Sequence, residues 1–130
     1  MDIIQNHYKE DPWKMCIACI LLNQTSNQQA RPILKNLFDK FPTPKKMLAA
    51  KDSDIVEIIK SAGLYNRRTA TIKKFTREYI KKEYSHISEL YGMGRFASDS
   101  YEIFINRNYC ISPTDKVLTK YLKWLKNEKR

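Results

Sequence analysis

Glycine, cysteine and long apolar runs are all scarce in this sequence. The 130 residues include three glycines and three cysteines, and the longest apolar run, residues 15–22, has eight residues. A membrane-spanning helix needs about 20 apolar residues, and the N-terminus has no secretory or transit pattern. We therefore expect no membrane partner. An odd number of cysteines argues against a disulfide framework and favours a reducing compartment.

Acidic residues are also few relative to basic ones. Asp and Glu together number 14 against 24 Lys and Arg, which gives a net charge of +10. Such an excess favours a polyanionic partner, most often a nucleic acid, and the alternative is a solvated basic face without a partner. A chain of this length can bury a core of its own. We expect one domain over residues 1–130, acting as a monomer.

Two of the cysteines form a CxxC pair. Cys16 and Cys19 lie within the apolar run MCIACILL, where packing in a core is a better explanation than a redox or metal role. A zinc site needs a second pair of ligands, and the third cysteine, Cys110, stands alone. We predict no metal site built from these side chains.

The apolar residues repeat at helical spacing in the first part of the chain. Asp11 before Pro12 predicts a helix start, and the helix that follows to about residue 22 is apolar nearly all round, which is typical of a buried helix. Ser26, Thr43 and Ser53 begin three more predicted helices, the last of which ends at a glycine.

The second part of the chain is predicted to be helical as well. Asn66 is a candidate cap for a long basic helix to about residue 83, a short helix runs through residue 90, and another covers residues 96–105. A last helix begins near residues 114–115. No segment alternates with period two, so we expect an all-α fold.

Two of the three glycines lie one residue apart, in the stretch ELYGMGRFASDSYEIF of residues 89–104. Glycine adopts positive φ without a steric penalty, which suits a tight turn. A helix, Gly-x-Gly, helix pattern is typical of a helix-hairpin-helix, whose turn N–H groups bind DNA phosphate beside a helix N-terminus. Gly92, Met93 and Gly94 are the candidate phosphate ligands, with Arg95 adding a charged contact. A plain connector is the alternative.

A carboxylate is expected beside this turn. A helix over residues 96–106 runs about 16 Å away from the glycines, and residues 107–112 can span up to about 20 Å on the way back. The segment Ser-Pro-Thr-Asp before the last helix would therefore place Asp115 near the hairpin. An Asp at such a position is more often only a helix cap.

Four segments in order resemble the helix-hairpin-helix DNA glycosylases, most closely the glycosylase domain of methyl-CpG-binding thymine glycosylases. They are IIQNHYKEDPWKMCIACILLNQTS, SAGLYNRRTATIKKF, ISELYGMGRFASDSYEIF and TDKVLTKYLKWL. The resemblance implies an all-α glycosylase of base excision repair whose partner is double-stranded DNA with a mismatched or deaminated base. It also implies nuclear residence if the source is eukaryotic.

The resemblance assigns roles to three residues. Asp115 matches the catalytic carboxylate, whose charge stabilises the positive sugar that forms as the base leaves. Gln5 matches a glutamine that contacts the extruded base, although a surface polar residue is the alternative. Leu64 matches an apolar wedge that enters the duplex; otherwise it is a helix-end contact.

Two positions depart from the family. Gln24 stands where the most similar family has an arginine that fills the gap left by the flipped base, and glutamine there is similar to endonuclease III and adenine glycosylases. Phe96 stands where bifunctional relatives have the Schiff-base lysine and thymine glycosylases have tyrosine. We therefore expect a monofunctional glycosylase in which Phe96 packs against the extruded base.

The cofactors of relatives are only partly expected here. The iron–sulfur cluster of several relatives needs four cysteines beyond the last helix, and we expect no such cluster. The hairpin carbonyls are candidates for a monovalent cation, as in the family. The leading hypothesis is excision of uracil or thymine opposite guanine. The alternatives are a non-catalytic helix-hairpin-helix DNA-binding module and an adenine glycosylase.

Overall fold

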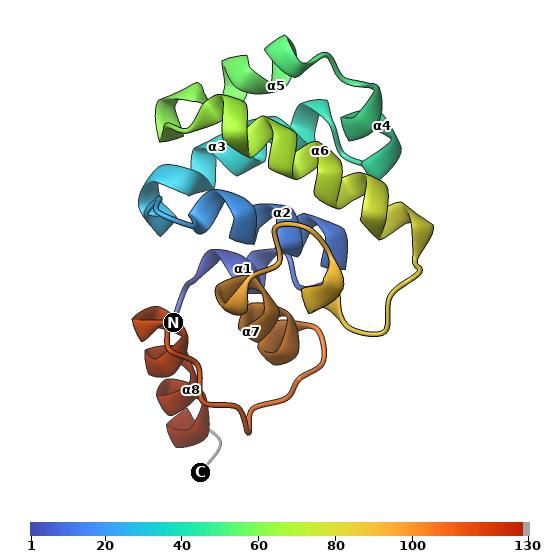
Figure 1. The fold of residues 1–130 in the computed structure, drawn as a ribbon. Coiled ribbons are helices and arrows are strands. Elements are labelled where there is room, and N and C mark those ends of the chain that lie inside the picture. The colour runs from blue at the N-terminus through green and yellow to red at the C-terminus, as the bar shows by residue number, and fades with distance from the viewer. Residues whose placement is uncertain (129–130) are drawn as a thin grey trace.

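The computed structural model describes residues 1–128, and these contain helices and no strands. This confirms the all-α prediction. Figure 1 shows α2 crossing the middle of the molecule, with α3 to α6 on one side and α1, α7 and α8 on the other. The α-helices are α1 Ile4–His7, α2 Pro12–Leu22, α3 Asn27–Lys40, α4 Pro44–Ala49, α5 Asp52–Ile59, α6 Tyr65–Lys81, α7 Arg95–Phe104 and α8 Lys116–Glu128, and the 3-10 helices are η1 Lys60–Ala62 and η2 Ile87–Glu89.

Side-chain caps start three of these helices where the sequence predicts them. Asp11 accepts a hydrogen bond from the N–H of Lys14 at the start of α2. Ser26 and Thr43 cap α3 and α4 in the same way. Each cap satisfies an N–H that the helix itself leaves without a partner.

Two predicted helix starts were wrong by one or two residues. Helix α6 begins at Tyr65, and its N-cap is Leu64, which has φ 50° and no side-chain bond to the first turn. Asn66 therefore lies within the helix. Helix α5 begins at Asp52, one residue before Ser53, and its N-cap also lacks a side-chain bond. No side-chain cap fixes the main chain at either start.

The buried apolar side chains form two clusters. The larger surrounds α2, which is buried on nearly every face as predicted. The smaller joins the chain start to α7 and α8, and its buried members are Ile3, Ile103, Phe104, Leu118, Tyr121 and Leu122. Phe96 packs against both clusters. Figure 1 shows α8 beside α7 and the N-terminus, so the smaller cluster holds the last helix in place.

Candidate active site

Two adjoining cavities open where the two apolar clusters meet. The larger has a volume of about 390 Å³ and the smaller about 280 Å³. Asn23, Gln24 and Phe96 line both of them. The residues predicted for base contact, catalysis, gap filling and the wedge all lie on the walls of one cavity or both.

The smaller cavity brings together three candidate residues from distant parts of the chain. Gln5 of α1, Phe96 of α7 and Asp115 before α8 line it together. Gln5 is 1% exposed, so the alternative of a surface polar residue is wrong. Its Nε2 donates to the Ser100 hydroxyl at 3.3 Å, while its Oε1 is buried without a hydrogen-bond partner. A buried acceptor without a partner is unfavourable, and a ligand with an N–H would satisfy it.

Asp115 is half-buried and caps α8. Its Oδ2 accepts a hydrogen bond from the N–H of Leu118 at 2.9 Å, so one carboxylate oxygen is fixed by the helix. The prediction that residues 107–112 return the chain to the hairpin is confirmed, because Asp115 and Phe96 line the same cavity. Arg95 donates to the carbonyl of Ser112 at 2.9 Å, which ties the start of α7 to the segment that carries Asp115.

The two hairpin glycines have different roles. Gly92 has φ 83°, and a Cβ there would lie 2.8 Å from Cγ2 of Thr71 on α6. Gly94 is the N-cap of α7 with φ −73° and open space where its Cβ would be. The expectation of positive φ therefore applies to Gly92 alone. Glycine is required at this position by the close approach of the turn to α6.

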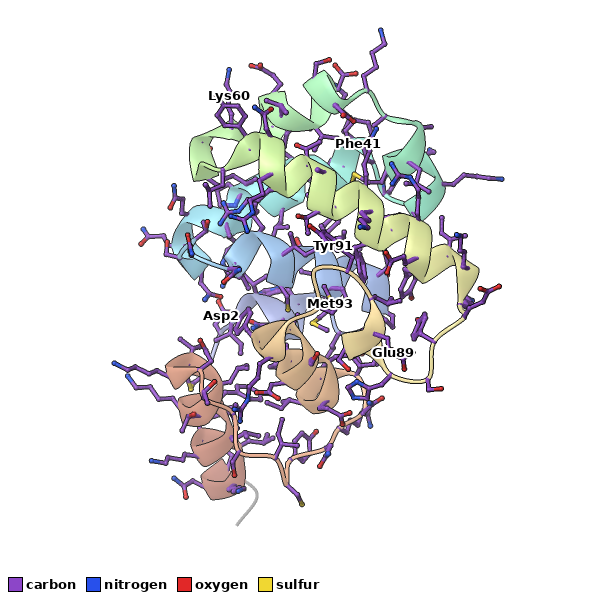
Figure 2. The ribbon with its side chains drawn as sticks, in the orientation of Figure 1. Asp2, Phe41, Lys60, Glu89, Tyr91 and Met93 are labelled. Carbon is purple, nitrogen blue, oxygen red and sulfur yellow. The ribbon has the colours of Figure 1, made fainter. Side chains whose placement is uncertain are left out.

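Met93 does not offer the phosphate ligand that the sequence predicts. Its side chain is 4% exposed and its N–H donates to the Leu90 carbonyl at 3.2 Å. Figure 2 shows Met93 and Tyr91 on the turn before α7. No side chain caps α7, so its first-turn N–H groups remain available to an anion. Arg95 stays a candidate phosphate contact, although its guanidinium also approaches Asp99 at 3.4 Å.

The larger cavity has a basic rim and two strained residues. Leu64 is 52% exposed, and both Leu64 and Gln24 adopt positive φ, at 50° and 73°. Such a conformation is uncommon for residues other than glycine and often marks a functional loop. Arg67 also lines this cavity, and Lys74 lies over the ring of Tyr91 at 4.3 Å. Several basic side chains therefore lie around the cavity that Leu64, the candidate DNA wedge, lines.

Two residues of the site are missed by sequence reasoning. Thr25 lines the smaller cavity, and its hydroxyl is buried without a partner. Arg68 lines the larger cavity and is buried at 5% exposed. A threonine in a loop gives no signal of its own. Arg68 belongs to a segment rich in basic residues, and the sequence pattern does not indicate that this one is buried.

Metal ligands do not gather at this site. Residues 1–128 contain no group of three or more His, Cys, Asp or Glu side chains placed to hold an ion. Cys16 and Cys19 are buried in the core, as predicted, and burial raises the pKa of Cys19 to about 12, which disfavours the thiolate that binds metals. No helix within the described part of the chain is long and apolar enough to cross a bilayer.

The sequence of this chain matches those of known proteins. Residues 17–130 match the HhH-GPD superfamily of base excision DNA repair proteins. The methyl-CpG-binding domain protein 4-like protein of Arabidopsis thaliana is 33% identical over 126 residues, which cover 96% of this chain and 28% of that protein. A thymine/uracil-DNA glycosylase of Pyrobaculum aerophilum is 28% identical over 55% of this chain and 31% of its own length. Endonuclease III of Thermotoga maritima is 28% identical over 60% of this chain and 37% of its own length.

These matches define the class of protein. The fold is that of a helix-hairpin-helix DNA glycosylase, as the resemblance implied. The chain belongs to the HhH-GPD superfamily of base excision DNA repair proteins. It spans between about a quarter and two fifths of the length of these three relatives.

Proposed function

We propose that this chain is a monofunctional DNA glycosylase that removes uracil or thymine mispaired with guanine. The observation that carries the proposal is the shared cavity of Gln5, Phe96 and Asp115, which adjoins the hairpin that would hold the DNA backbone. A base inside a duplex is inaccessible, so the target nucleotide must rotate out of the stack into this cavity.

Asp115 supplies the charge for the reaction. As the bond between the sugar C1′ and the base nitrogen breaks, positive charge develops on the deoxyribose. The carboxylate stabilises that charge, and it accepts a proton from the water whose oxygen attacks C1′. The base leaves with the bonding electrons and takes up a proton, and an abasic sugar remains in the strand. The bond from Leu118 to Oδ2 keeps the carboxylate in place.

The polar groups of the cavity favour a base that offers an N–H. Gln5 Oε1 and the Thr25 hydroxyl are buried without partners, and uracil and thymine both have a protonated N3. The name of the Pyrobaculum aerophilum relative, a thymine/uracil-DNA glycosylase, agrees with this substrate class. Uracil is expected to be the easier substrate, because thymine adds a methyl group that must also fit.

Phe96 is the basis for proposing hydrolysis without strand cleavage. Schiff-base formation needs an amine on the side chain at the sugar, and phenylalanine offers only an apolar ring. Its position between the cavities and both apolar clusters suits a surface against which an extruded base packs.

The accompanying proposals concern cofactors, location and assembly. We propose that the reaction needs no iron–sulfur cluster and that the protein acts as a monomer on double-stranded DNA, in the nucleus if its source is eukaryotic. A monovalent cation at the hairpin would use main-chain carbonyls there. Those of Leu90 and Met93 already accept hydrogen bonds from Met93 and Ser98, so their remaining lone pairs would serve it.

The test is a panel of duplexes that carry G·U, G·T, A·U and an adenine opposite 8-oxoguanine. Each is incubated with the protein and then analysed with and without alkali, which cleaves abasic sites. Product from G·U and G·T only after alkali, lost in Asp115→Asn, supports the proposal. Strand breaks without alkali overturn the monofunctional assignment. Product from the adenine duplex alone overturns the proposed substrate.

A DNA-binding module without activity is the second candidate. The Phe96 side chain favours it, because it lacks the hydroxyl of thymine glycosylases. Tight duplex binding with no product from any substrate would establish it. The half-buried carboxylate of Asp115 in the cavity argues for catalysis, since a phosphate binder gains nothing from a negative charge.

A further inference from the structure

Arg68 is a buried charge without an acidic partner. It lies in the first turn of α6 with 5% of its surface exposed, and burial lowers the pKa of its guanidinium. Buried charges are normally paired with an opposite charge. Within the described residues Arg68 forms no salt bridge, and its hydrogen-bond partners are three main-chain carbonyls.

These carbonyls belong to two separate loops. Nη1 of Arg68 donates to the carbonyls of Ala62 and Gly63, at 2.9 and 3.2 Å. Nη2 donates to the carbonyl of Asn23. The first two carbonyls precede Leu64 and the third precedes Gln24, the two residues proposed to enter DNA. One planar guanidinium, whose N–H groups form a fixed fork, therefore spans both loops.

The main chain beside these bonds is left-handed in both loops. Gln24, Gly63 and Leu64 have φ values of 73°, 80° and 50°. Side-chain-bearing residues keep such a conformation only where the surrounding structure holds it. Leu64 has no side-chain cap bond that would do so. Arg68 bonds the carbonyl of Asn23, directly before Gln24, and those of Gly63 and Ala62, the two residues before Leu64.

We propose that Arg68 is a positioning residue that locks the Gln24 loop and the Leu64 turn together, so that both side chains enter the duplex as one rigid unit. The entry into DNA rests on the proposed function, whereas the lock is a property of the free protein. A rigid unit is advantageous because neither loop has to be ordered when DNA binds.

The lock is tested first without DNA, by hydrogen exchange. The amides of Thr25 and Gly63 donate to the carbonyls of Leu22 and Lys60 at 3.1 and 3.0 Å, so both report on their loops. Arg68→Met is expected to speed exchange at both amides by about tenfold and to leave α3 unchanged. The matched control is Arg67→Met, which removes an exposed neighbouring charge and should leave both amides unaffected. Unchanged exchange at either amide in Arg68→Met overturns the proposal.

A second variant separates the fork from the charge. Arg68→Lys keeps a positive charge but replaces the two nitrogens of the planar fork with a single one, so it should not reproduce all three carbonyl bonds. It is expected to speed exchange in at least one loop, and wild-type protection of both loops would overturn the proposal. This variant also carries the test if Arg68→Met does not fold, as judged by its circular dichroism and thermal transition.

The effect on DNA is tested by single-turnover excision on the G·U duplex. Arg68→Met should lower the rate by about tenfold, with the salt dependence of duplex binding unchanged because the group is buried. The same substitution made in a Gln24→Ala, Leu64→Ala background should have little further effect, since the side chains it positions are gone. A full, additive tenfold loss there overturns the proposal. If the wild type excises nothing, the proposed function fails, and the exchange data still decide the lock.

Discussion

Two aspartates of this protein occupy the same local structure and have different surroundings. Asp11 and Asp115 each precede a helix and accept a hydrogen bond from the N–H three residues on, at 3.2 and 2.9 Å. Asp11 starts the buried helix α2 and lines neither cavity, whereas Asp115 starts α8 and lines the smaller cavity beside Phe96. The comparison shows that a capping motif alone does not tell which carboxylate faces a cavity.

The largest expected effect separates these two carboxylates. Asp115→Asn should lower single-turnover excision by about a thousandfold, because the charge that stabilises the sugar is lost. Asp11→Asn should leave the rate unchanged. Asparagine is as good an N-cap as aspartate, so the stability of both variants, measured by urea unfolding, should remain within about 0.5 kcal/mol of the wild type. Equal rate losses in the two variants would remove the distinction.

The hairpin glycines offer the same kind of comparison at the level of the main chain. Gly92→Ala should lower the free energy of unfolding by about 1–2 kcal/mol or more, since alanine disfavours positive φ and its Cβ would meet Thr71. Gly94→Ala should cost less, no more than about 1 kcal/mol, because φ is negative and the space is open, and only the preference for glycine over alanine at an N-cap is lost. Urea unfolding of both variants provides the measurement. Similar losses at the two positions would contradict the difference in their roles.

Gln5 and Thr76 are both buried and polar, but only Gln5 has an oxygen without a hydrogen-bond partner. Gln5→Leu should reduce excision by about tenfold, and it should change stability by less than about 1 kcal/mol, because Oε1 already lacks a partner. Thr76 is buried and fully bonded to Trp13 and Ile72. Thr76→Val should lower stability by about 1–3 kcal/mol, since the Trp13 N–H loses its acceptor, and leave excision intact. Excision kinetics and thermal unfolding of both variants would show whether the roles divide in this way.

The smallest effect concerns the three cysteines, which differ in how accessible they are to a reagent. Cys110 is exposed, whereas Cys16 and Cys19 are buried and burial raises the pKa of both thiols. Because the thiolate is the reactive form, iodoacetamide at pH 8 should modify one cysteine in the native protein and three after unfolding. Mass spectrometry gives the count. Modification of Cys16 or Cys19 in the native state would show that the core around α2 opens.

The pKa shift of Cys19 also gives a direction for stability against pH. Its folded-state pKa, about 12, lies above the ordinary value of 9.0. The stability that comes from keeping this thiol neutral is therefore fully present below pH 9 and declines as pH rises from there toward 12.

The sequence by itself determined the local features of this protein. Caps at Asp11, Ser26 and Thr43 and the helical spacing of apolar residues specify helices that the structure confirms. They do so because a cap and an amphipathic pattern act over one or two turns of chain. The basic composition and the family motifs, likewise visible in the sequence, led to the superfamily that the comparisons show.

Tertiary structure alone decided which side chains face one another. Gln5, Phe96 and Asp115 share a cavity because α8 packs on α7 and the chain start through the smaller apolar cluster. That packing depends on contacts between residues some hundred positions apart, which no local pattern encodes. The inward turn of Arg68 toward two loops and the burial of the Met93 donor have the same origin. Each is a consequence of where neighbouring helices leave room, and not of the residue's own type.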